Sequence, residues 1–156
     1  MMAGSHVVLG AAAWHVAALA LSVPADDPLM LGLAGLGALL PDIDHPKSWA
    51  GRKLGPLSML IGGVFGHRGI THSLLAVLIC LGLLVWGGLG AMAMPVVVGY
   101  LSHLVGDGLT VSGVPLLWPW RRPFGLPLVR TGTLTETALV AALALVAGQD
   151  VWRQLG

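Results

Sequence analysis

The sequence predicts an all-α fold: a polytopic transmembrane bundle of about five spans with one re-entrant or interfacial segment, forming a single domain over residues 1–156. Two observations support this prediction, and a third excludes one class of partner. Hydrophobic residues make up 56% of the chain and charged residues only 10%, far from the average of soluble proteins. The apolar residues form several long segments separated by short polar turns. The net charge of +1 gives no electrostatic basis for a nucleic-acid partner.

The first half of the chain contains two apolar segments of unequal length. Residues 5–23 are long enough to cross a bilayer, and their alanines offer a small-residue surface for close helix packing. After a turn at 24–28, residues 29–40 would rise only about 18 Å as a helix, and such short spans often mark a site at membrane depth. Residues 41–56 are expected to form a polar loop. Residues 57–66 are too short to cross and are expected to be re-entrant or interfacial.

The second half contains three further apolar segments. Residues 73–89 and 91–107 are expected to be spans, joined by a turn at the glycines of 87–90. Residues 110–131 hold four prolines and several tryptophans and arginines, which is typical of an interfacial loop. A last apolar helix is expected at 134–148.

The basic residues predict the orientation of these spans. Six of the eight lysines and arginines lie in two loops, at 47–53 and 121–130. The positive-inside rule then places the N-terminus and both basic loops in the cytoplasm.

With this orientation, the candidate metal ligands all fall at the cytoplasmic ends of their segments. An unpaired buried carboxylate costs several kcal/mol, so a carboxylate and histidine cluster implies a compensating cation. Nitrogen and oxygen ligands without thiolate favour zinc, with manganese or iron as alternatives, and six to eight such groups suit two ions. The predicted metal ligands are His6, Asp42, Asp44, His67, His72, His103, Asp107 and Glu136.

Two pairs of these residues are close in sequence. His103 and Asp107 are four residues apart and share one helix face, where they can bind one ion together or form a hydrogen bond inside the bundle. Asp42 and Asp44 would point to the same side of an extended backbone. The alternative for this second pair is an Asx-type turn or solvation in the loop.

The segment around Arg68 combines two histidines with a cation. His67 and His72 are about 140° apart around a helix, so they need a turn at Gly69 to face one centre. Otherwise they are separate packing histidines. Arg68 between them is suited to stabilising an anionic transition state, or alternatively anchors the topology at the interface.

Three more residues, Glu136, His6 and His45, have two interpretations each. Glu136 with Thr133 forms a capping box before an apolar run, so it is either a ligand or a helix cap. His6 is a ligand or an interfacial histidine, whereas His15 lies on the opposite helix face and is expected to pack. His45 is a ligand or orients Asp44 through a hydrogen bond.

Four motifs carry a resemblance to a known family, and this resemblance covers roughly residues 4–136. In combination they resemble the YdjM-type, LexA-regulated family of inner-membrane metal-dependent hydrolases. The motifs are Leu40-Pro-Asp-Ile-Asp-His-Pro-Lys-Ser48, Gly66-His-Arg-Gly-Ile-Thr-His-Ser-Leu-Leu-Ala-Val77, Gly99-Tyr-Leu-Ser-His103 with Asp107, and Gly113-Val-Pro-Leu-Leu-Trp-Pro119.

This resemblance implies a bacterial inner-membrane location and a place in the site for His6 and Glu136. The family is also distantly similar to zinc-dependent phospholipase C, in which a His-x-x-x-Asp pair and a late glutamate bind zinc. That similarity implies the same role for His103, Asp107 and Glu136.

These features together predict a metal-dependent phosphoester hydrolase acting on a lipid or lipid-linked phosphate at the cytoplasmic membrane face. The metal would activate a water, Arg68 would neutralise the developing charge, and Asp44 or His45 would handle the proton. The alternative is a divalent-metal transporter or sensor without hydrolysis, and a third possibility is a closed structural metal site. The absence of His-Glu-x-x-His disfavours a metalloprotease. The sequence leaves the oligomeric state open.

Overall fold

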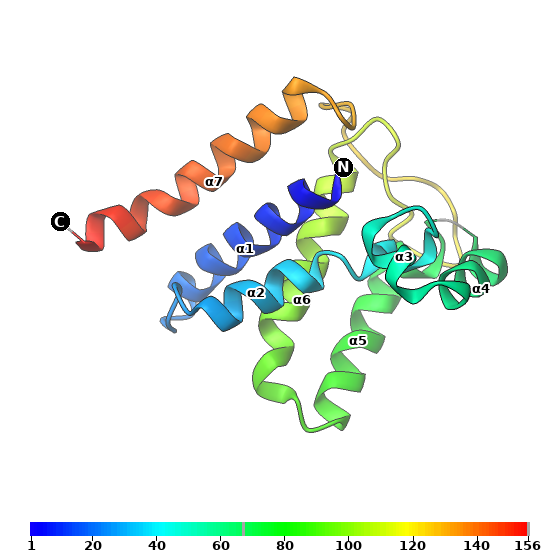
Figure 1. Ribbon diagram of the computed structural model, residues 1–156, viewed down its shortest axis with the longest axis horizontal. Helices are drawn as coiled ribbons and strands as arrows, with labels where there is room; N and C mark the ends of the chain where they lie inside the picture. The colour runs from blue at the N-terminus through cyan, green and yellow to red at the C-terminus, as the bar shows by residue number, and fades with distance from the viewer. Residues whose placement is uncertain (67, 156) are drawn as a thin grey trace.

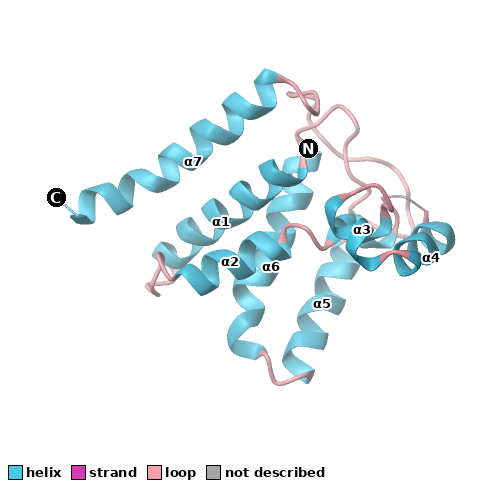
Figure 2. Ribbon diagram, viewed as in Figure 1, coloured by secondary structure: helices cyan, strands magenta, loops and turns pink. Residues whose placement is uncertain are grey.

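The computed structural model describes residues 1–66 and 68–155, with side chains described as far as residue 149. This part of the chain forms seven α-helices and two short 3₁₀ helices, and it contains no strand beyond two isolated bridges in the long loop before the last helix. Figure 2 shows this loop running past the other helices. The predicted all-α class is therefore confirmed.

The helix bounds follow most of the predicted segments. In chain order the elements are α1 (Ala3–Ala20), α2 (Pro28–Gly37), η1 (Pro41–Asp44), α3 (Trp49–Leu54), α4 (Pro56–Phe65), η2 (Ile70–His72), α5 (Leu74–Trp86), α6 (Gly90–Gly108) and α7 (Leu134–Leu155).

Residues 41–56 were expected to form a polar loop, but this segment contains the two short helices η1 and α3. Pro41 opens η1 at a position where its fixed φ suits a helical turn. Ser48 begins α3, because its hydroxyl accepts a hydrogen bond from the N–H of Gly51 at 2.8 Å.

The helices α1, α2 and α6 pack against one another at the centre of the molecule (Figure 1). A Cβ at Gly99 of α6 would collide with the backbone of Ala34 in α2, and one at Gly10 of α1 would lie 2.7 Å from the oxygen of Ala34. Glycine is therefore required at both crossings, and the small-residue surface predicted for the first segment is used here, with Ala18 fully buried.

The remaining helices extend from this centre. α5 runs back along α6 after the predicted glycine turn, and α7 lies beside α1 (Figure 1). Buried Tyr100 and Leu104 of α6 pack against Val77 of α5 and Val114 of the long loop. This packing fixes the last two turns of α6, from which two of the candidate ligands project.

Only α1, among the described residues, is both long and apolar enough to cross a membrane by itself. Shorter apolar helices cover Pro56–Phe65, Leu74–Trp86 and Leu134–Gln149. The helices thus agree with the predicted all-α class, but their lengths do not confirm the predicted number of five spans.

Candidate metal centre

Four elements bring five of the predicted ligands together. His6 comes from the first turn of α1, Asp42 from η1, His72 from η2, and His103 and Asp107 from the end of α6. They form two groups of three, His6–His103–Asp107 and Asp42–His72–His103, and within each group one ligand atom per residue lies within 4.8 Å of the others. His103 belongs to both groups, so the two possible ion positions are adjacent.

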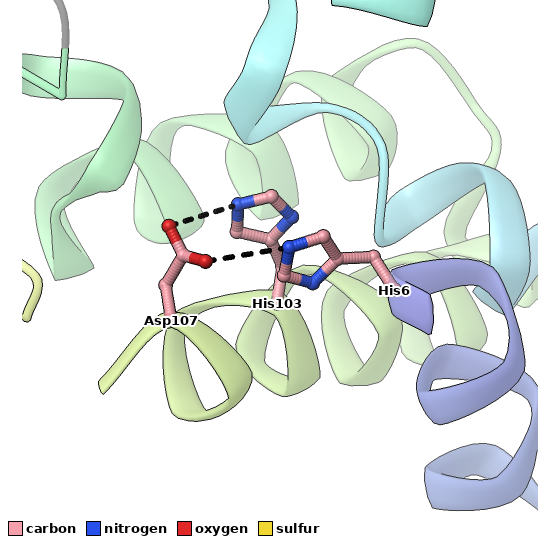
Figure 3. Close-up of side chains that lie close together, drawn as sticks. All are labelled: His6, His103 and Asp107. Atoms are coloured by element: carbon pink, nitrogen blue, oxygen red, sulfur yellow. Dashed lines mark ion pairs between the residues drawn. The ribbon is translucent and has the colours of Figure 1, made fainter. Parts of the chain in front are cut away.

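His103 is held in the tautomer that suits a metal ligand. Its Nδ1 lies 2.7 Å from the carbonyl oxygen of Ala38, and because a carbonyl only accepts, Nδ1 must carry the proton. The lone pair of Nε2 then points into the cluster, 3.9 Å from a carboxylate oxygen of Asp42 and 3.9 Å from one of Asp107. The predicted helix-face pairing of His103 and Asp107 is confirmed (Figure 3).

His72 is oriented in the same way by a different partner. The hydroxyl of Thr71 donates to Oδ2 of Asp44 at 2.6 Å, so its oxygen is left to accept the Nδ1 proton of His72 at 3.1 Å. The Nε2 of His72 consequently faces the cluster, 3.4 Å from Nε2 of His103. Tyr100 holds this segment in place, because its hydroxyl donates to the carbonyl of Thr71.

Asp42 and Asp44 do not lie on the same side, contrary to the expectation from an extended backbone. They belong to a 3₁₀ helix, in which residues two apart point in different directions. Asp42 approaches the Nε2 edge of His72, at 3.9 Å, whereas Asp44 lies 3.5 Å from Nδ1 of the same ring. Among the described residues, Asp44 thus contacts the Nδ1 side of His72 and is in neither three-residue group.

Asp107 lies between several positive or polar groups. One oxygen is 2.7 Å from the amino nitrogen of Met1 and 3.4 Å from Nε2 of His6, and the other is 2.6 Å from Nη2 of Arg68. Arg68 also donates through Nη1 to the carbonyl of Gly113 at 2.9 Å, so its guanidinium is fixed at the edge of the cluster. The prediction that Arg68 lies beside the site is consistent with this position.

His6 stacks on His103, with ring centroids 3.7 Å apart and planes at 15° (Figure 3). It is 1% exposed, and its Nδ1 has no hydrogen-bond partner in the described part of the chain. A buried ring nitrogen without a partner costs about 1–3 kcal/mol, so this atom is better explained as part of a site that binds a ligand.

Glu136 is fully buried but occupies a separate place. Its two oxygens accept hydrogen bonds from the N–H groups of Met2 and Gly132, both at 2.7 Å. It is in neither three-residue group among the described residues. The alternative of a capping box is incomplete among the described residues, because the hydroxyl of Thr133 contacts the carbonyl of Arg130 and the hydroxyl of Thr135, and Glu136 accepts from Gly132.

The remaining predicted residues lie around the centre or outside the description. His45 ends η1 and is half-buried, outside both groups among the described residues. His67 lies outside the described residues. His15 packs as expected, with Nδ1 3.1 Å from the carbonyl of Ala25.

The charges of the centre suit a divalent cation. Asp107 pairs with Arg68 and with the amino group of Met1, whereas Asp42 lies 3.9 Å from Nε2 of His72 and 3.9 Å from Nε2 of His103. The Nε2 atoms of His72 and His103 face each other at 3.4 Å, and two lone pairs this close are favourable only when a cation lies beside them. The residues present therefore fit a metal ion or a pair of ions. The side chains of Asp42 and Arg68 are 20% and 23% exposed, so water can reach this edge.

Reasoning from the sequence missed the residues that orient the ligands. Thr71 is one of these residues, and its position directly before His72 was the available signal. The carbonyl groups of Ala38 and Gly113 carry no signal in the side-chain pattern, since any residue supplies a carbonyl.

The fold is helical, and its buried histidines and carboxylates meet where several helices end. These two features place the chain among helical proteins with a candidate metal site. The chain belongs to the YdjM inner membrane protein family, which matches residues 1–155. It is accordingly a protein of the bacterial inner membrane.

Relatives from three bacteria support this assignment. The chain is 49% identical over 116 residues to the inner membrane protein YdjM of Escherichia coli (strain K12), covering 69% of this chain and 59% of the relative, and the YdjM of Shigella flexneri gives the same values. It thus matches less than two thirds of the length of these relatives. It is 39% identical over 124 residues to the uncharacterized protein YvsG of Bacillus subtilis (strain 168), covering 78% of each. No solved structure matches the chain.

Proposed function

We propose that this protein is a metal-dependent phosphoester hydrolase that acts on a lipid or lipid-linked phosphate at the cytoplasmic face of the inner membrane. The single observation that carries the proposal is the pair of three-residue groups that share His103. Two adjacent ion positions built from histidine and carboxylate are typical of hydrolytic centres. Zinc is the best candidate for this ligand set, with manganese or iron as alternatives.

Each residue of the centre has a role in this proposal. A divalent ion, when bound, supplies Lewis acidity and lowers the pKa of water toward neutrality. Arg68 is fixed at the edge of the site, where its charge would stabilise an anionic transition state. Asp44 keeps His72 oriented, and the half-buried His45 or a spare carboxylate would exchange the proton with solvent.

A groove beside the centre supports a lipid substrate. It has a volume of about 540 Å³ and lies between α1, α6 and α7. Its lining includes Gly106, which precedes Asp107 and whose Cβ position lies 3.6 Å from the ring of His6. Among the described residues that line it, Ser102 alone has a polar side chain, and that hydroxyl donates to the carbonyl of Gly99. The groove thus suits a hydrocarbon chain with its phosphate directed toward the metal centre.

The membrane arrangement of about five spans belongs to the same proposal. Large apolar side chains on α5, such as Leu78 at 63% and Trp86 at 87% exposure, suit contact with lipid. With both basic loops on the cytoplasmic side, the centre would lie at the inner membrane boundary.

The test is phosphate release from labelled phospholipid vesicles by the purified, zinc-loaded protein. Release should require the metal and should be lost with a chelator and with the variant Asp107→Asn. His15→Gln, which changes a buried histidine outside the centre, serves as the control. Release that continues after both chelation and Asp107→Asn would contradict the proposal.

A further inference from the structure

A second cavity lies on the loop side of the metal centre. It has a volume of about 290 Å³ and is lined by the turn around Arg68 and the loop at 112–123. Its charged lining residues are both arginines, Ser112 adds a hydroxyl, and no acidic side chain is among the described lining residues. Phe65, Pro115 and Pro123 form its apolar walls. Arg68, Ser112 and Arg121 bring hydrogen-bond donors to its lining.

Arg68 connects this cavity to the metal centre. Nη2 contacts Asp107 and Nη1 contacts the carbonyl of Gly113, which leaves further N–H groups of the guanidinium available, since arginine has five. Its main chain adopts φ +56°, a costly conformation for a residue other than glycine. The N–H bond to Asp44 at 2.9 Å helps to hold this conformation, so the guanidinium is positioned in advance.

Arg121 is the unpaired cation of the cavity. Its side chain is exposed, and the described residues give it no hydrogen bond or ion pair. Its Nη1 reaches over the turn, to within 3.8 Å of where a Cβ would lie on Gly66. Arg122 differs, because its guanidinium lies 5.6 Å from the ring centroid of Trp120 and it does not line the cavity.

We propose that this cavity binds the phosphate group of the substrate, with Arg121 as its specificity-determining contact. The proposal rests on the proposed hydrolase function and adds the way in which the substrate is recognised. Two guanidinium groups and a hydroxyl match the oxygens of a phosphate, for which arginine is the preferred side chain. A volume of about 290 Å³ is at the low end for ligand pockets, so the cavity suits a phosphate with a small head group.

The first experiment measures binding without catalysis. Purified full-length protein is treated with phenylglyoxal, which modifies arginine, in inorganic phosphate or in chloride of equal ionic strength. Mass spectrometry then gives the modification rates of Arg121 and Arg122. Saturating phosphate should slow modification of Arg121 roughly tenfold and leave Arg122 unchanged. Equal rates for Arg121 in both salts would overturn the proposal.

The second experiment uses variants in the hydrolysis assay. Arg121→Gln should raise KM for the phospholipid roughly tenfold and leave kcat within about twofold, since the lost contact is to the bound phosphate. Arg121→Lys should restore part of the loss, and Arg122→Gln, with the same change of charge, should behave as the wild type. An unchanged KM for Arg121→Gln, or an equal rise for Arg122→Gln, would overturn the proposal.

The two proposals can fail separately. Phosphate protection of Arg121 in a protein that hydrolyses no phospholipid would support the cavity as a phosphate site and refute the hydrolase. Hydrolysis that Arg121→Gln leaves intact, without protection by phosphate, would support the hydrolase and refute this cavity.

Discussion

Arg68 joins two acidic residues of the centre, because Nη2 lies 2.6 Å from Oδ2 of Asp107 while its main-chain N–H donates to Asp44 at 2.9 Å. A single residue in a strained main-chain conformation thus connects η1, α6 and, through Gly113, the long loop. Such strain is found mainly where surrounding contacts enforce it, often at functional sites.

Replacing Arg68 by glutamine should reduce kcat about 10²–10³-fold, since a fixed charge aimed at a developing anion contributes on this scale. The metal content should stay the same, because Arg68 is not among the candidate ligands. Phosphate release and elemental analysis measure the two effects. Arg52→Gln, an exposed change on α3, is the control. A large loss of metal would instead show that Arg68 maintains the fold of the site.

His103 belongs to both three-residue groups, whereas His6 and His72 each belong to one. Replacing these histidines should therefore lower the metal content by different amounts. His103→Ala should lower the content toward zero, whereas His6→Ala and His72→Ala should each remove about one ion of two, because each belongs to one group. Elemental analysis of the purified variants gives the counts, with His15→Gln as the control. Equal losses in all three ligand variants would indicate a single ion.

Thr71 positions two residues with one hydroxyl, so its removal tests the hydrogen bonds that orient His72. Thr71→Val should weaken metal binding about 10–100-fold, the usual effect of losing a partner that orients a ligand. Ser73→Ala removes the cap of α5, whose oxygen accepts from the N–H of Ala76, and should lower thermal stability without weakening metal binding. Competition with a chelator measures the affinity. Similar affinities in the two variants would contradict the role of Thr71.

Much of this centre could be predicted from the sequence because helical spacing is regular. His103 and Asp107 share a face wherever the helix lies, and the segment ends were marked by glycine and proline. The turn that joins α5 to α6 falls in the predicted glycine run. His6 reaches the same place because α1 packs directly against α6.

The features of the fold and the site that could not be predicted from the sequence depend on local geometry, which the periodicity of apolar residues does not encode. Helices of four and six residues, η1 and α3, are too short to show a repeat, so the segment at 41–56 was expected to be a loop. The 3₁₀ geometry of η1 then places Asp42 and Asp44 on different edges of His72. The positive φ of Arg68 was equally unpredictable, because the adjoining Gly69 was the obvious site for the turn.

The crossing of α2 and α6 depends on Gly99, where the main chains approach too closely for a side chain. Gly99→Ala should lower the free energy of unfolding by about 1–3 kcal/mol, the usual cost of overpacking. Gly82→Ala in α5 is the matched control, because nothing lies within 4 Å of its Cβ position and alanine favours the helix. Thermal unfolding in detergent compares them. Equal stability of the two variants would contradict the close crossing.

The apolar groove between α1, α6 and α7 predicts that chain length matters to the substrate. Ala17 lines this groove, and Ala17→Phe should fill part of its volume of about 540 Å³ without touching the metal ligands. Hydrolysis of a long-chain phospholipid should fall about tenfold or more, because a hydrocarbon chain displaced from the groove loses roughly 0.8 kcal/mol per buried methylene. Hydrolysis of a short-chain, water-soluble phosphoester should change by less than about twofold, since its chain does not reach the groove. Ala91→Phe, on the exposed first turn of α6 and outside the groove, is the control for added bulk. An equal loss on both substrates would mean that Ala17→Phe disturbs the metal centre, and no loss on either would mean that the chain lies elsewhere.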